Sequence, residues 1–395
     1  MRIAVFTDSY RPYTSGVVRS IETFREELHA LGHQVYIFAP RYGSSHHREE
    51  AVYRFFSLPS PTNPEYNIAI PISLRLKNTL KRLRVDLIHA HSPFMLGRLG
   101  AHCARDLGLP LVFTYHTLYD HYVHYLPVAR SLTRKVTRML CVRFCNRCDM
   151  VLVPTWVIGE YIRELGVAVP ITKLPTGIEV ERFQKGNPHW LREKFGLRAE
   201  EKVLLFVGRL GQEKNVDFLL RAYRRVLEAA PEIPTRLVLV GGGPETKHLR
   251  RVTASLGLEE RVLFTGPLSS QDVVHCYAGA YLFVFPSVTE TQGLVIGEAK
   301  AAGVPAVAVN AFGVREMIAH GEDGYLTPLE EEAFADRIVE LLADPERHRR
   351  MVDAARERSR ELSAKILGKR LEGIYRALIE NHTRDKQLLR RPYGG

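Results

Sequence analysis

Long hydrophobic runs are absent from this sequence of 395 residues. A helix that crosses a bilayer needs about 20 consecutive apolar residues, so we expect no membrane span. The apolar stretch at residues 3–6 is followed closely by Asp8 and is too short for the hydrophobic region of a signal peptide. We therefore expect a buried first strand there, in a protein of the cytoplasm.

Cysteine is scarce, since the chain has only five. That number is too small for a disulfide framework in a chain of this length. Cys141, Cys145 and Cys148 have a spacing that also occurs in iron–sulfur sites, whose ligands usually lie on a loop around the cluster. Here the segment has the pattern of a basic amphipathic helix that leads into a strand, so we expect no cluster.

Acidic residues are outnumbered, because 44 aspartates and glutamates face 55 lysines and arginines, which gives a net charge of +11. Such an excess favours an anionic partner: nucleic acid, a membrane surface or a phosphorylated substrate. The sequence has no helix-turn-helix, zinc-finger or aromatic-platform motif. We therefore expect no nucleic-acid partner and regard a basic nucleic-acid-binding protein as the non-enzyme alternative.

Basic residues concentrate in two segments, 72–84 and 127–147, that have the pattern of amphipathic helices. This pattern is typical of helices that dock on anionic lipid. An equally good interpretation places the apolar side of each helix in the core and leaves a solvated basic face. The basic residues are Arg75, Lys77, Lys81, Arg82 and Arg84 in the first segment and Arg130, Arg134, Lys135, Arg138, Arg143 and Arg147 in the second, with apolar Ile72, Leu76, Leu80, Leu83, Leu132, Val136, Met139, Leu140 and Phe144 among them.

Short apolar runs alternate with helical patterns along the whole chain, which is typical of parallel sheets with crossover helices. The length favours two domains. We predict an α/β fold with two Rossmann-like, doubly wound domains that face each other across a cleft. Strands are predicted near 2–7, 34–39, 51–57, 86–89, 110–115 and 150–153 in the first half and near 203–208, 236–240, 262–264, 281–285 and 305–308 in the second.

The predicted first domain covers residues 1–170 and the second covers residues 171–365, with a linker rich in proline and glycine at 166–190. We expect residues 366–395 to form a helix that packs back toward the first domain and ends in a loose tail. Ligands of doubly wound folds bind beyond the carboxyl ends of the strands. Each motif described below follows a predicted strand, and therefore belongs to that edge.

Glu290 and Glu298 form the strongest motif. Glu290 lies in a loop after a buried strand, and Gly293 then opens a helix that carries Glu298. Backbone N–H groups around Gln292, Gly293 and Leu294 have no partner within such a helix and can donate to a ligand. Carboxylates that accept from hydroxyls, beside amides that donate to oxygens, suit a sugar with an attached diphosphate.

A second motif follows the strand predicted at 203–208. Arg209 can bind phosphate oxygens with two hydrogen bonds, and Lys214 adds a charge beside a helix N-terminus. The chain lacks the Asp-x-Asp motif that would favour a metal at the phosphates, so we expect these cations to stabilise the leaving group without one. Gly243, in a loop that Pro244 keeps from matching a dinucleotide fingerprint, predicts a close approach of the backbone to a nucleotide.

These motifs, in this order, resemble those of the GT-B retaining glycosyltransferases of family four. The resemblance covers essentially the whole chain and includes residues 176–183, which are similar to the start of the family's second domain. It implies that Arg209 and Lys214 hold the diphosphate of a nucleotide-sugar donor, that Glu298 binds the ribose and that Glu290 binds the transferred sugar. It also implies that residues 292–294 line the sugar pocket and that no cofactor beyond the donor is required.

The first half resembles the acceptor side of the same family. Residues 8–18 are similar to the family's glycine-containing first loop. This similarity implies that Gly16 contributes to donor binding and that Asp8 and Tyr10 contact the acceptor.

Residues 114–125 resemble the corresponding segment of bacterial enzymes that transfer glucose to diacylglycerol. The resemblance implies that His116 lies beside the reacting sugar and acts in catalysis with Glu290. It also implies that Tyr119 and Tyr122 contact the acceptor.

His89 and His91 alternate along a predicted strand as metal ligands often do. Alternation points both side chains the same way, but no third ligand is in sight. We therefore expect these histidines to have a structural role or a substrate contact, and we predict no metal site.

The sequence as a whole predicts a retaining hexosyltransferase that moves glucose from UDP-glucose onto a lipid such as 1,2-diacylglycerol, as a peripheral protein on the inner face of the cell membrane. The same donor chemistry with a soluble or phosphorylated sugar, a polyol or a glycan as acceptor is the alternative. In the family's mechanism the departing phosphate takes the acceptor proton, while Glu290 and His116 stabilise the oxocarbenium-like sugar.

Overall fold

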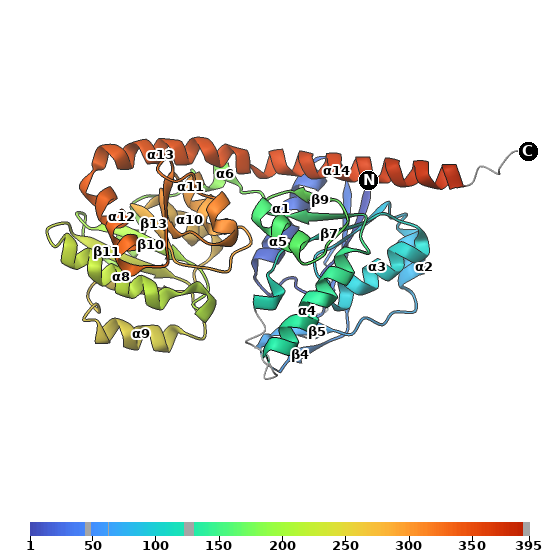
Figure 1. The fold of residues 1–395 in the computed structure, drawn as a ribbon, viewed down its shortest axis with the longest axis horizontal. Coiled ribbons are helices and arrows are strands. Elements are labelled where there is room, and N and C mark those ends of the chain that lie inside the picture. Colours follow the sequence, from blue (N-terminus) through green and yellow to red (C-terminus); the bar gives the residue numbers. More distant parts are fainter. Residues whose placement is uncertain (44–48, 62, 122–129, 390–395) are drawn as a thin grey trace, which may run out of the picture. The chain divides into compact units, whose positions relative to one another are not determined.

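The computed structural model describes residues 1–43, 49–61, 63–121 and 130–389. The chain forms two compact units, which can be followed by colour in Figure 1. Unit 1 comprises Met1–Gly177 together with Ala364–Gly395, and unit 2 comprises Ile178–Ser363. Each unit has its own parallel sheet and its own hydrophobic core.

Unit 1 is built on a seven-stranded parallel sheet with the order β3-β2-β1-β6-β7-β8-β9. The central strands are short apolar runs that are buried on both faces, as a parallel sheet between two layers of helices requires. The strands are β1 (Arg2–Phe6), β2 (Gln34–Pro40), β3 (Val52–Phe55), β6 (Leu87–Ala90), β7 (Leu111–Thr114), β8 (Met150–Val153) and β9 (Ile171–Lys173), and a separate antiparallel pair consists of β4 (Ser57–Ser60) and β5 (Asn63–Ala69). The helices are α1 (Gly16–Ala30), α2 (Leu76–Arg82), α3 (Met95–Leu107), α4 (Arg130–Cys145), α5 (Trp156–Glu164) and α14 (Ala364–Leu389).

Helix α14 completes unit 1, although it follows unit 2 in the chain. It lies beside α1 (Figure 1), and its residues Leu367, Leu371 and Tyr375 belong to the hydrophobic core of unit 1. At the point where the chain leaves and re-enters the unit, a Cβ atom on Gly177 would lie 2.5 Å from the Cα of Ala364. The close approach of these two segments therefore requires a glycine at position 177.

The structure differs from the predicted linker at residues 166–190. β9 pairs with β8, and the short helices α6 (Val180–Phe183) and α7 (Trp190–Phe195) follow. The prolines and glycines of this region lie mostly between these elements. Each element is too short to show the periodicity on which a prediction from sequence depends.

Unit 2 is built on a six-stranded parallel sheet with the order β12-β11-β10-β13-β14-β15. Its strands are buried runs of valine, leucine, phenylalanine and alanine that end at glycine or proline in several cases. The strands are β10 (Lys202–Val207), β11 (Thr235–Val240), β12 (Val262–Gly266), β13 (Leu282–Phe285), β14 (Ala306–Val309) and β15 (Gly324–Thr327). Besides α6 and α7, the helices are α8 (Val216–Ala229), α9 (Thr246–Ser255), α10 (Ser270–Ala278), α11 (Leu294–Ala301), α12 (Glu331–Ala343) and α13 (Pro345–Ser359).

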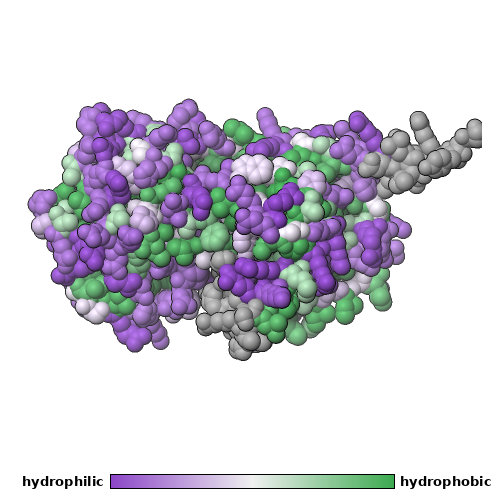
Figure 2. Space-filling view, in the orientation of Figure 1, coloured by the Kyte–Doolittle hydropathy of each residue, from purple (hydrophilic) through white to green (hydrophobic). Residues whose placement is uncertain are grey.

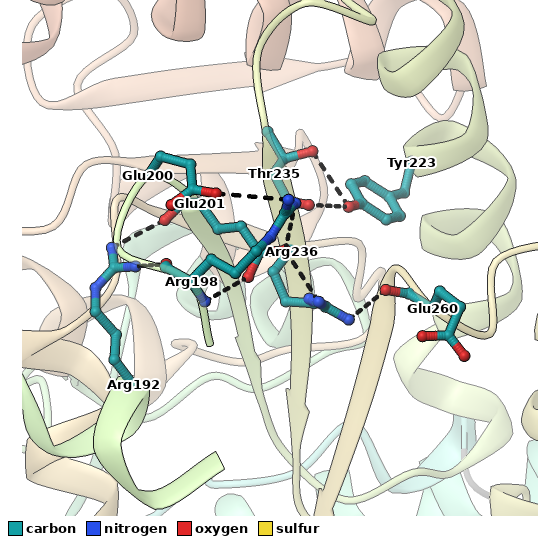
Figure 3. A network of polar contacts seen from close by, with 8 residues as sticks. All are labelled: Arg192, Arg198, Glu200, Glu201, Tyr223, Thr235, Arg236 and Glu260. Carbon is teal, nitrogen blue, oxygen red and sulfur yellow. Dashed lines mark hydrogen bonds and ion pairs between the residues drawn. The ribbon is translucent and has the colours of Figure 1, made fainter. Parts of the chain in front are cut away.

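A polar network fastens the amino ends of β10 and β11 (Figure 3). The buried Glu201 carboxylate accepts from Arg236 Nη2 at 2.9 Å and from the backbone N–H of Arg198 at 3.0 Å. Burial alone would raise the pKa of Glu201, but these hydrogen bonds outweigh it and hold the pKa below its ordinary value. The network thus stabilises the sheet at the amino ends of these strands, opposite to the loops that follow their carboxyl ends.

Candidate functional site

Three loops of unit 2 begin at the carboxyl ends of β10, β11 and β13. β10 pairs with both β11 and β13, so the loops that follow these strands start side by side at one edge of the sheet. The loops are residues 208–215, 241–245 and 286–293. They contain the predicted donor-site residues of unit 2, except for Leu294 and Glu298, which lie in α11.

Glu290 and Lys214 form an ion pair that joins two of these loops. Ser287 Oγ donates to the same carboxylate oxygen, Oε1, at 2.8 Å, and the Lys214 ammonium lies 5.8 Å from the centroid of the Phe285 ring. The exposed fractions of the Lys214 and Glu290 side chains are 18% and 17%, so a ligand can reach them while most of their surface is shielded. The structure thus brings together the two residues predicted to bind the diphosphate and the sugar.

The loop that carries Glu290 is held in a defined conformation. Gly293 has a φ of 83°, in the left-handed region that glycine adopts without strain, and directly precedes α11. The N–H of Gly313 donates to the Glu290 carbonyl at 2.9 Å, and a Cβ on Gly313 would lie 2.0 Å from the Thr291 carbonyl oxygen. The sequence analysis missed Gly313, for which a glycine shortly after an apolar strand was the only signal. The predicted site residue Gln292 is buried in this loop.

Glu298 is buried in the body of α11. The hydroxyl of Tyr277, a buried residue of α10, donates to its Oε2 at 2.9 Å. The Glu298 carboxylate therefore has a partner inside the protein, which the sequence analysis did not identify. Leu294, the first residue of the same helix, is half-buried. The ribose contact of Glu298 stays a prediction.

The loop after β10 packs closely on the loop after β11. The N–H of Leu210 donates to the Gly242 carbonyl at 2.9 Å. A Cβ on Gly241 would lie 2.0 Å from the Gly208 carbonyl oxygen, and one on Gly243 would lie 2.4 Å from that of Leu210. The sequence analysis attributed the close backbone approach at Gly243 to a nucleotide, whereas contact between the two loops already requires these glycines.

Arg209 is exposed in the first of these loops, and Lys214 stands at the end of the same loop. Asn215 follows with a φ of 56° and turns the chain into α8. Two cations and the N-terminus of α11 thus lie in loops that leave one sheet edge, together with the Glu290 carboxylate. Such a set can neutralise an anionic group and accept hydrogen bonds from hydroxyls next to it.

Three imidazoles stack in unit 1 at the ends of β6 and β7, which are paired strands. The ring centroids of His89 and His91 are 4.1 Å apart, and those of His91 and His116 are 5.0 Å apart. His91 Nδ1 lies 2.8 Å from His116 Nε2, which is a hydrogen-bonding distance. The sequence analysis named these histidines but did not foresee that His91 and His116 are partners.

All three imidazoles are neutral near physiological pH. Burial is the main cause that lowers the pKa of His89 and of His116 to about 3, and it holds the pKa of His91 well below its ordinary value. The neighbouring imidazoles add to the effect for His89 and His91, because a second positive charge nearby is unfavourable. His116 can therefore act as a neutral hydrogen-bonding group, and not as a cation.

Asp8 has a structural role in unit 1, and its predicted contact with an acceptor stays a prediction. It is buried, and its Oδ1 accepts from the backbone N–H of Leu96 at 2.8 Å, while Ser92 Oγ donates to Oδ2. The carboxylate thus caps the N-terminus of α3. Burial raises the pKa of Asp8, and these hydrogen bonds offset only part of the effect.

Tyr10 is also buried, and its predicted contact with an acceptor stays a prediction. Its hydroxyl is hydrogen-bonded to the Glu22 carboxylate and to Arg25 Nη1, so it is satisfied within unit 1. Gly16 is the first residue of α1, where Ser15 Oγ accepts from a backbone N–H of the first turn at 3.3 Å. Tyr10 and Ser15 therefore have clear structural roles in the first loop.

Tyr119 is half-buried and packs edge-on against Phe94, with a centroid distance of 5.1 Å, and against Tyr115 at 5.8 Å. Tyr122, the other acceptor contact predicted in this segment, lies outside the described residues. The aromatic group around Tyr119 leaves part of its ring accessible. Both acceptor contacts stay predictions.

Among the residues that the structure describes, no group of three or more histidine, cysteine, aspartate or glutamate side chains could hold a metal ion. Cys141, Cys145 and Cys148 are buried free thiols. Burial raises the pKa of each, to about 12 for Cys145, so the thiols are protonated. Their side chains pack in the core beside α4 and β8.

Comparison with known proteins gave matches along nearly the whole chain. The family model described as Glycosyltransferase Family 4 matches residues 14–182, and the one described as Glycosyl transferases group 1 matches residues 190–358. The alpha-monoglucosyldiacylglycerol synthase of Streptococcus pneumoniae is 31% identical over 97% of this chain and 87% of its own length. The GDP-mannose-dependent alpha-mannosyltransferase of Corynebacterium glutamicum is 29% identical over 90% of this chain and 84% of its own. The crystal structure of Anabaena Alr3699/HepE in complex with UDP has a TM-score of 0.78 at 21% identity, covering 95% of this chain and 100% of that one.

Proposed function

Since the chain belongs to the family-four glycosyltransferases and has their GT-B fold, we propose that it transfers glucose from UDP-glucose to a membrane lipid such as 1,2-diacylglycerol and retains the anomeric configuration. The donor part of this proposal rests on unit 2 and the acceptor part on unit 1. The name of the Streptococcus pneumoniae relative supports the lipid acceptor. The name of the Corynebacterium glutamicum relative makes GDP-mannose the second candidate donor.

The observation that carries the donor proposal is the Glu290–Lys214 pair at the carboxyl edge of the unit 2 sheet. A nucleotide sugar combines a diphosphate, which needs cations, with sugar hydroxyls, which need acceptors. Arg209 and Lys214 supply the first, and Glu290 supplies the second. UDP is bound in the Anabaena structure, which supports a nucleoside diphosphate as the ligand of this fold.

The proposed reaction breaks the bond between the anomeric carbon and the terminal phosphate oxygen and forms a bond from the same carbon to the acceptor hydroxyl oxygen. The departing phosphate accepts the acceptor's proton, so charges and atoms balance without another base. Arg209 and Lys214 stabilise the negative charge that develops on the phosphate. Glu290 and His116 contact the transferred sugar, whose ring gains positive charge at the transition state.

Exposed hydrophobic side chains support a membrane surface as the place of the acceptor. Among the described residues no helix is long and apolar enough to cross a bilayer. In the part of the chain that the structure describes, all but one of the exposed large hydrophobic side chains nevertheless belong to unit 1, and Figure 2 shows hydrophobic surface along its lower edge. They are Phe56, Leu58, Ile68, Ile72, Leu74, Met95, Leu132, Val136, Met139, Trp156 and Ile366, and the exception is Leu329 in unit 2.

The side chains of α4 favour the interpretation that this helix docks on a membrane over the interpretation that its basic face is only solvated. Cys141, Phe144 and Cys145 point into the core, whereas Leu132, Val136 and Met139 are 61%, 40% and 42% exposed on the opposite side. The exposed residues recur at intervals of four and three, and therefore form one stripe along the helix. The exposed cations Lys135 and Arg143 fall on the same side. An apolar stripe flanked by cations suits a bilayer with anionic headgroups.

The basic side chains of α4 that the structure describes form two groups: Lys135 and Arg143 are exposed, whereas Arg134 and Arg138 make contacts within unit 1. Arg134 Nε and Arg138 Nε donate to the buried Asp120 carboxylate at 3.4 Å and 2.8 Å, and the Tyr161 hydroxyl donates to it at 2.6 Å. These contacts attach the helix to unit 1. In the other basic segment, residues 72–84, Leu76 and Leu80 are buried, so α2 itself packs on the core.

Replacing Leu132, Val136 and Met139 together by serine should weaken binding to anionic vesicles by roughly tenfold or more, because apolar burial contributes about 25 cal/mol per Å². Co-sedimentation with vesicles of phosphatidylglycerol and phosphatidylcholine measures this. Leu329→Ser, at a side chain that is 51% exposed in unit 2, is the matched control and should bind as the unchanged protein does. Equal binding of the triple variant would remove α4 from the docking surface.

The reaction is tested by UDP release from UDP-glucose, with and without diacylglycerol in anionic vesicles, and by the same assay with GDP-mannose. We expect release from UDP-glucose that depends on diacylglycerol. Slow UDP release that does not depend on diacylglycerol would support a transferase whose acceptor is a soluble sugar. If only GDP-mannose is cleaved, GDP-mannose is the donor in place of UDP-glucose. If no nucleotide sugar is cleaved, the proposed function is refuted.

A further inference from the structure

A row of contacts within unit 1 runs from α14 to His116. Both ring nitrogens of His89 are engaged, since Nδ1 lies 2.6 Å from the Tyr375 hydroxyl of α14 and Nε2 lies 2.7 Å from Thr114 Oγ1. His89 and Tyr375 are fully or nearly fully buried. The first imidazole of the row is therefore fixed in position by side chains from α14 and β7.

His91 contacts both His89 and His116 and so links the fixed ring of His89 to that of His116. Its ring packs on that of His89 at 4.1 Å and lies nearly parallel to that of His116, with 17° between the planes. Its Nδ1 forms the hydrogen bond of 2.8 Å to His116 Nε2. His91 is buried, whereas His116 is partly exposed at the end of this row.

The hydrogen bond constrains His116 in two ways. A neutral imidazole carries one N–H donor and one acceptor nitrogen, so a bond between two neutral imidazoles couples their tautomers: the bonded nitrogen of one ring is protonated and that of the other is not. Rotation of the His116 ring would also break the bond and leave a polar nitrogen of His91 unsatisfied in a buried place, which is costly. His91 thus restricts the orientation of the His116 ring and couples the tautomer of His116 to its own.

We propose that His91 is a positioning residue for the transfer reaction, which holds the His116 imidazole in the orientation and tautomer that the transferred sugar requires. This inference rests on the proposed function, in which His116 contacts that sugar. A catalytic group displaced by about 1 Å can cost on the order of 100-fold in rate, so a positioning residue has a measurable effect without touching the substrate.

Two substitutions of similar size and polarity test the proposal. In His91→Asn a side-chain polar atom stays one bond from Cγ, where Nδ1 was, while in His91→Gln the polar atoms move one bond outward. We expect kcat of His91→Asn to remain within about threefold of the unchanged protein and kcat of His91→Gln to fall about tenfold or more. KM for UDP-glucose should change less than kcat in both, because the donor residues of unit 2 are unaltered.

The double variant His91→Gln/His116→Ala separates positioning from a general loss of structure. If His91 acts through His116, the double variant is as slow as His116→Ala alone. A full additional loss from His91→Gln in that background would overturn the proposal, and so would wild-type kcat in His91→Gln when His116→Ala is slow. A wild-type rate in His116→Ala would instead remove His116 from the proposed function and this inference with it.

A measurement without turnover keeps the inference testable if no acceptor is found. The 15N chemical shifts of the His116 imidazole report which nitrogen carries the proton. In the full-length protein we expect one predominant tautomer, preserved in His91→Asn and mixed in His91→Gln. The same mixture of tautomers in the unchanged protein would contradict the proposal, whatever the substrate is.

Discussion

Glu290→Gln should lower the rate of glucosyl transfer by roughly 100- to 1000-fold, the loss typical when one group that stabilises transition-state charge is removed. Glutamine keeps the shape of the side chain and can still accept a hydrogen bond from Ser287 and from sugar hydroxyls. It lacks the negative charge that favours a sugar ring with developing positive charge. The loss should therefore appear mainly in kcat.

Binding of UDP distinguishes this effect from damage to the loop. Lys214 is paired with Glu290 in the structure, so a carboxylate competes with the diphosphate for the ammonium. Glu290→Gln removes that competition, and calorimetry should show UDP bound at least as tightly as by the unchanged protein. Glu332→Gln, which makes the same change at an exposed residue of α12, is the control for charge. A variant that transfers glucose at the normal rate would exclude Glu290 from catalysis.

The three histidines should lower the unfolding free energy of unit 1 by about 4 kcal/mol between pH 7.5 and pH 5.5, a large part of the stability of a typical domain. His89 and His116 have pKa values of about 3 in the folded protein, that of His91 is well below its ordinary value, and each histidine titrates near 6.5 when unfolded. Below pH 6.5 the unfolded chain therefore binds protons that the folded unit does not. Each histidine then contributes a loss of about 1.4 kcal/mol per pH unit.

The two tryptophans of the chain allow the units to be followed separately. Trp156 lies in α5 of unit 1 and Trp190 in α7 of unit 2. Urea unfolding of Trp190→Phe by fluorescence reports unit 1, and Trp156→Phe reports unit 2, where His348 is a half-buried histidine with a lowered pKa. We expect a clearly smaller loss in unit 2. Equal stability of unit 1 at the two pH values would mean that the three imidazoles are not held neutral.

The fold class and the family could be predicted because the decisive patterns are local. Strands predicted near 203–208 and 236–240 are observed at Lys202–Val207 and Thr235–Val240, since each is a buried apolar run that ends at glycine. The Glu290 motif could be recognised for the same reason. Its strand, loop and helix follow one another within a few residues, and the structure places Lys214 beside it as the strand order requires.

The partners of these residues could not be predicted, because they come from distant parts of the chain. Tyr375 contacts His89 across 286 positions, and nothing in its own helix distinguishes it from another core tyrosine. Tyr277, the partner of Glu298, is likewise one of several aromatic residues in the core. The contact of His91 with His116 depends on the pairing of β6 with β7, which a sequence motif does not contain.

The place of α14 in unit 1 has a consequence for how the protein is made. Most of unit 1 is translated before unit 2, but helix α14 leaves the ribosome only after the whole of unit 2. Until then the groups that α14 covers, including the ring of His89, lack their partner in the nascent chain. Of the two units, the one whose synthesis starts earlier is therefore completed later, and a chain that stops before Ala364 has a finished unit 2 and an unfinished unit 1.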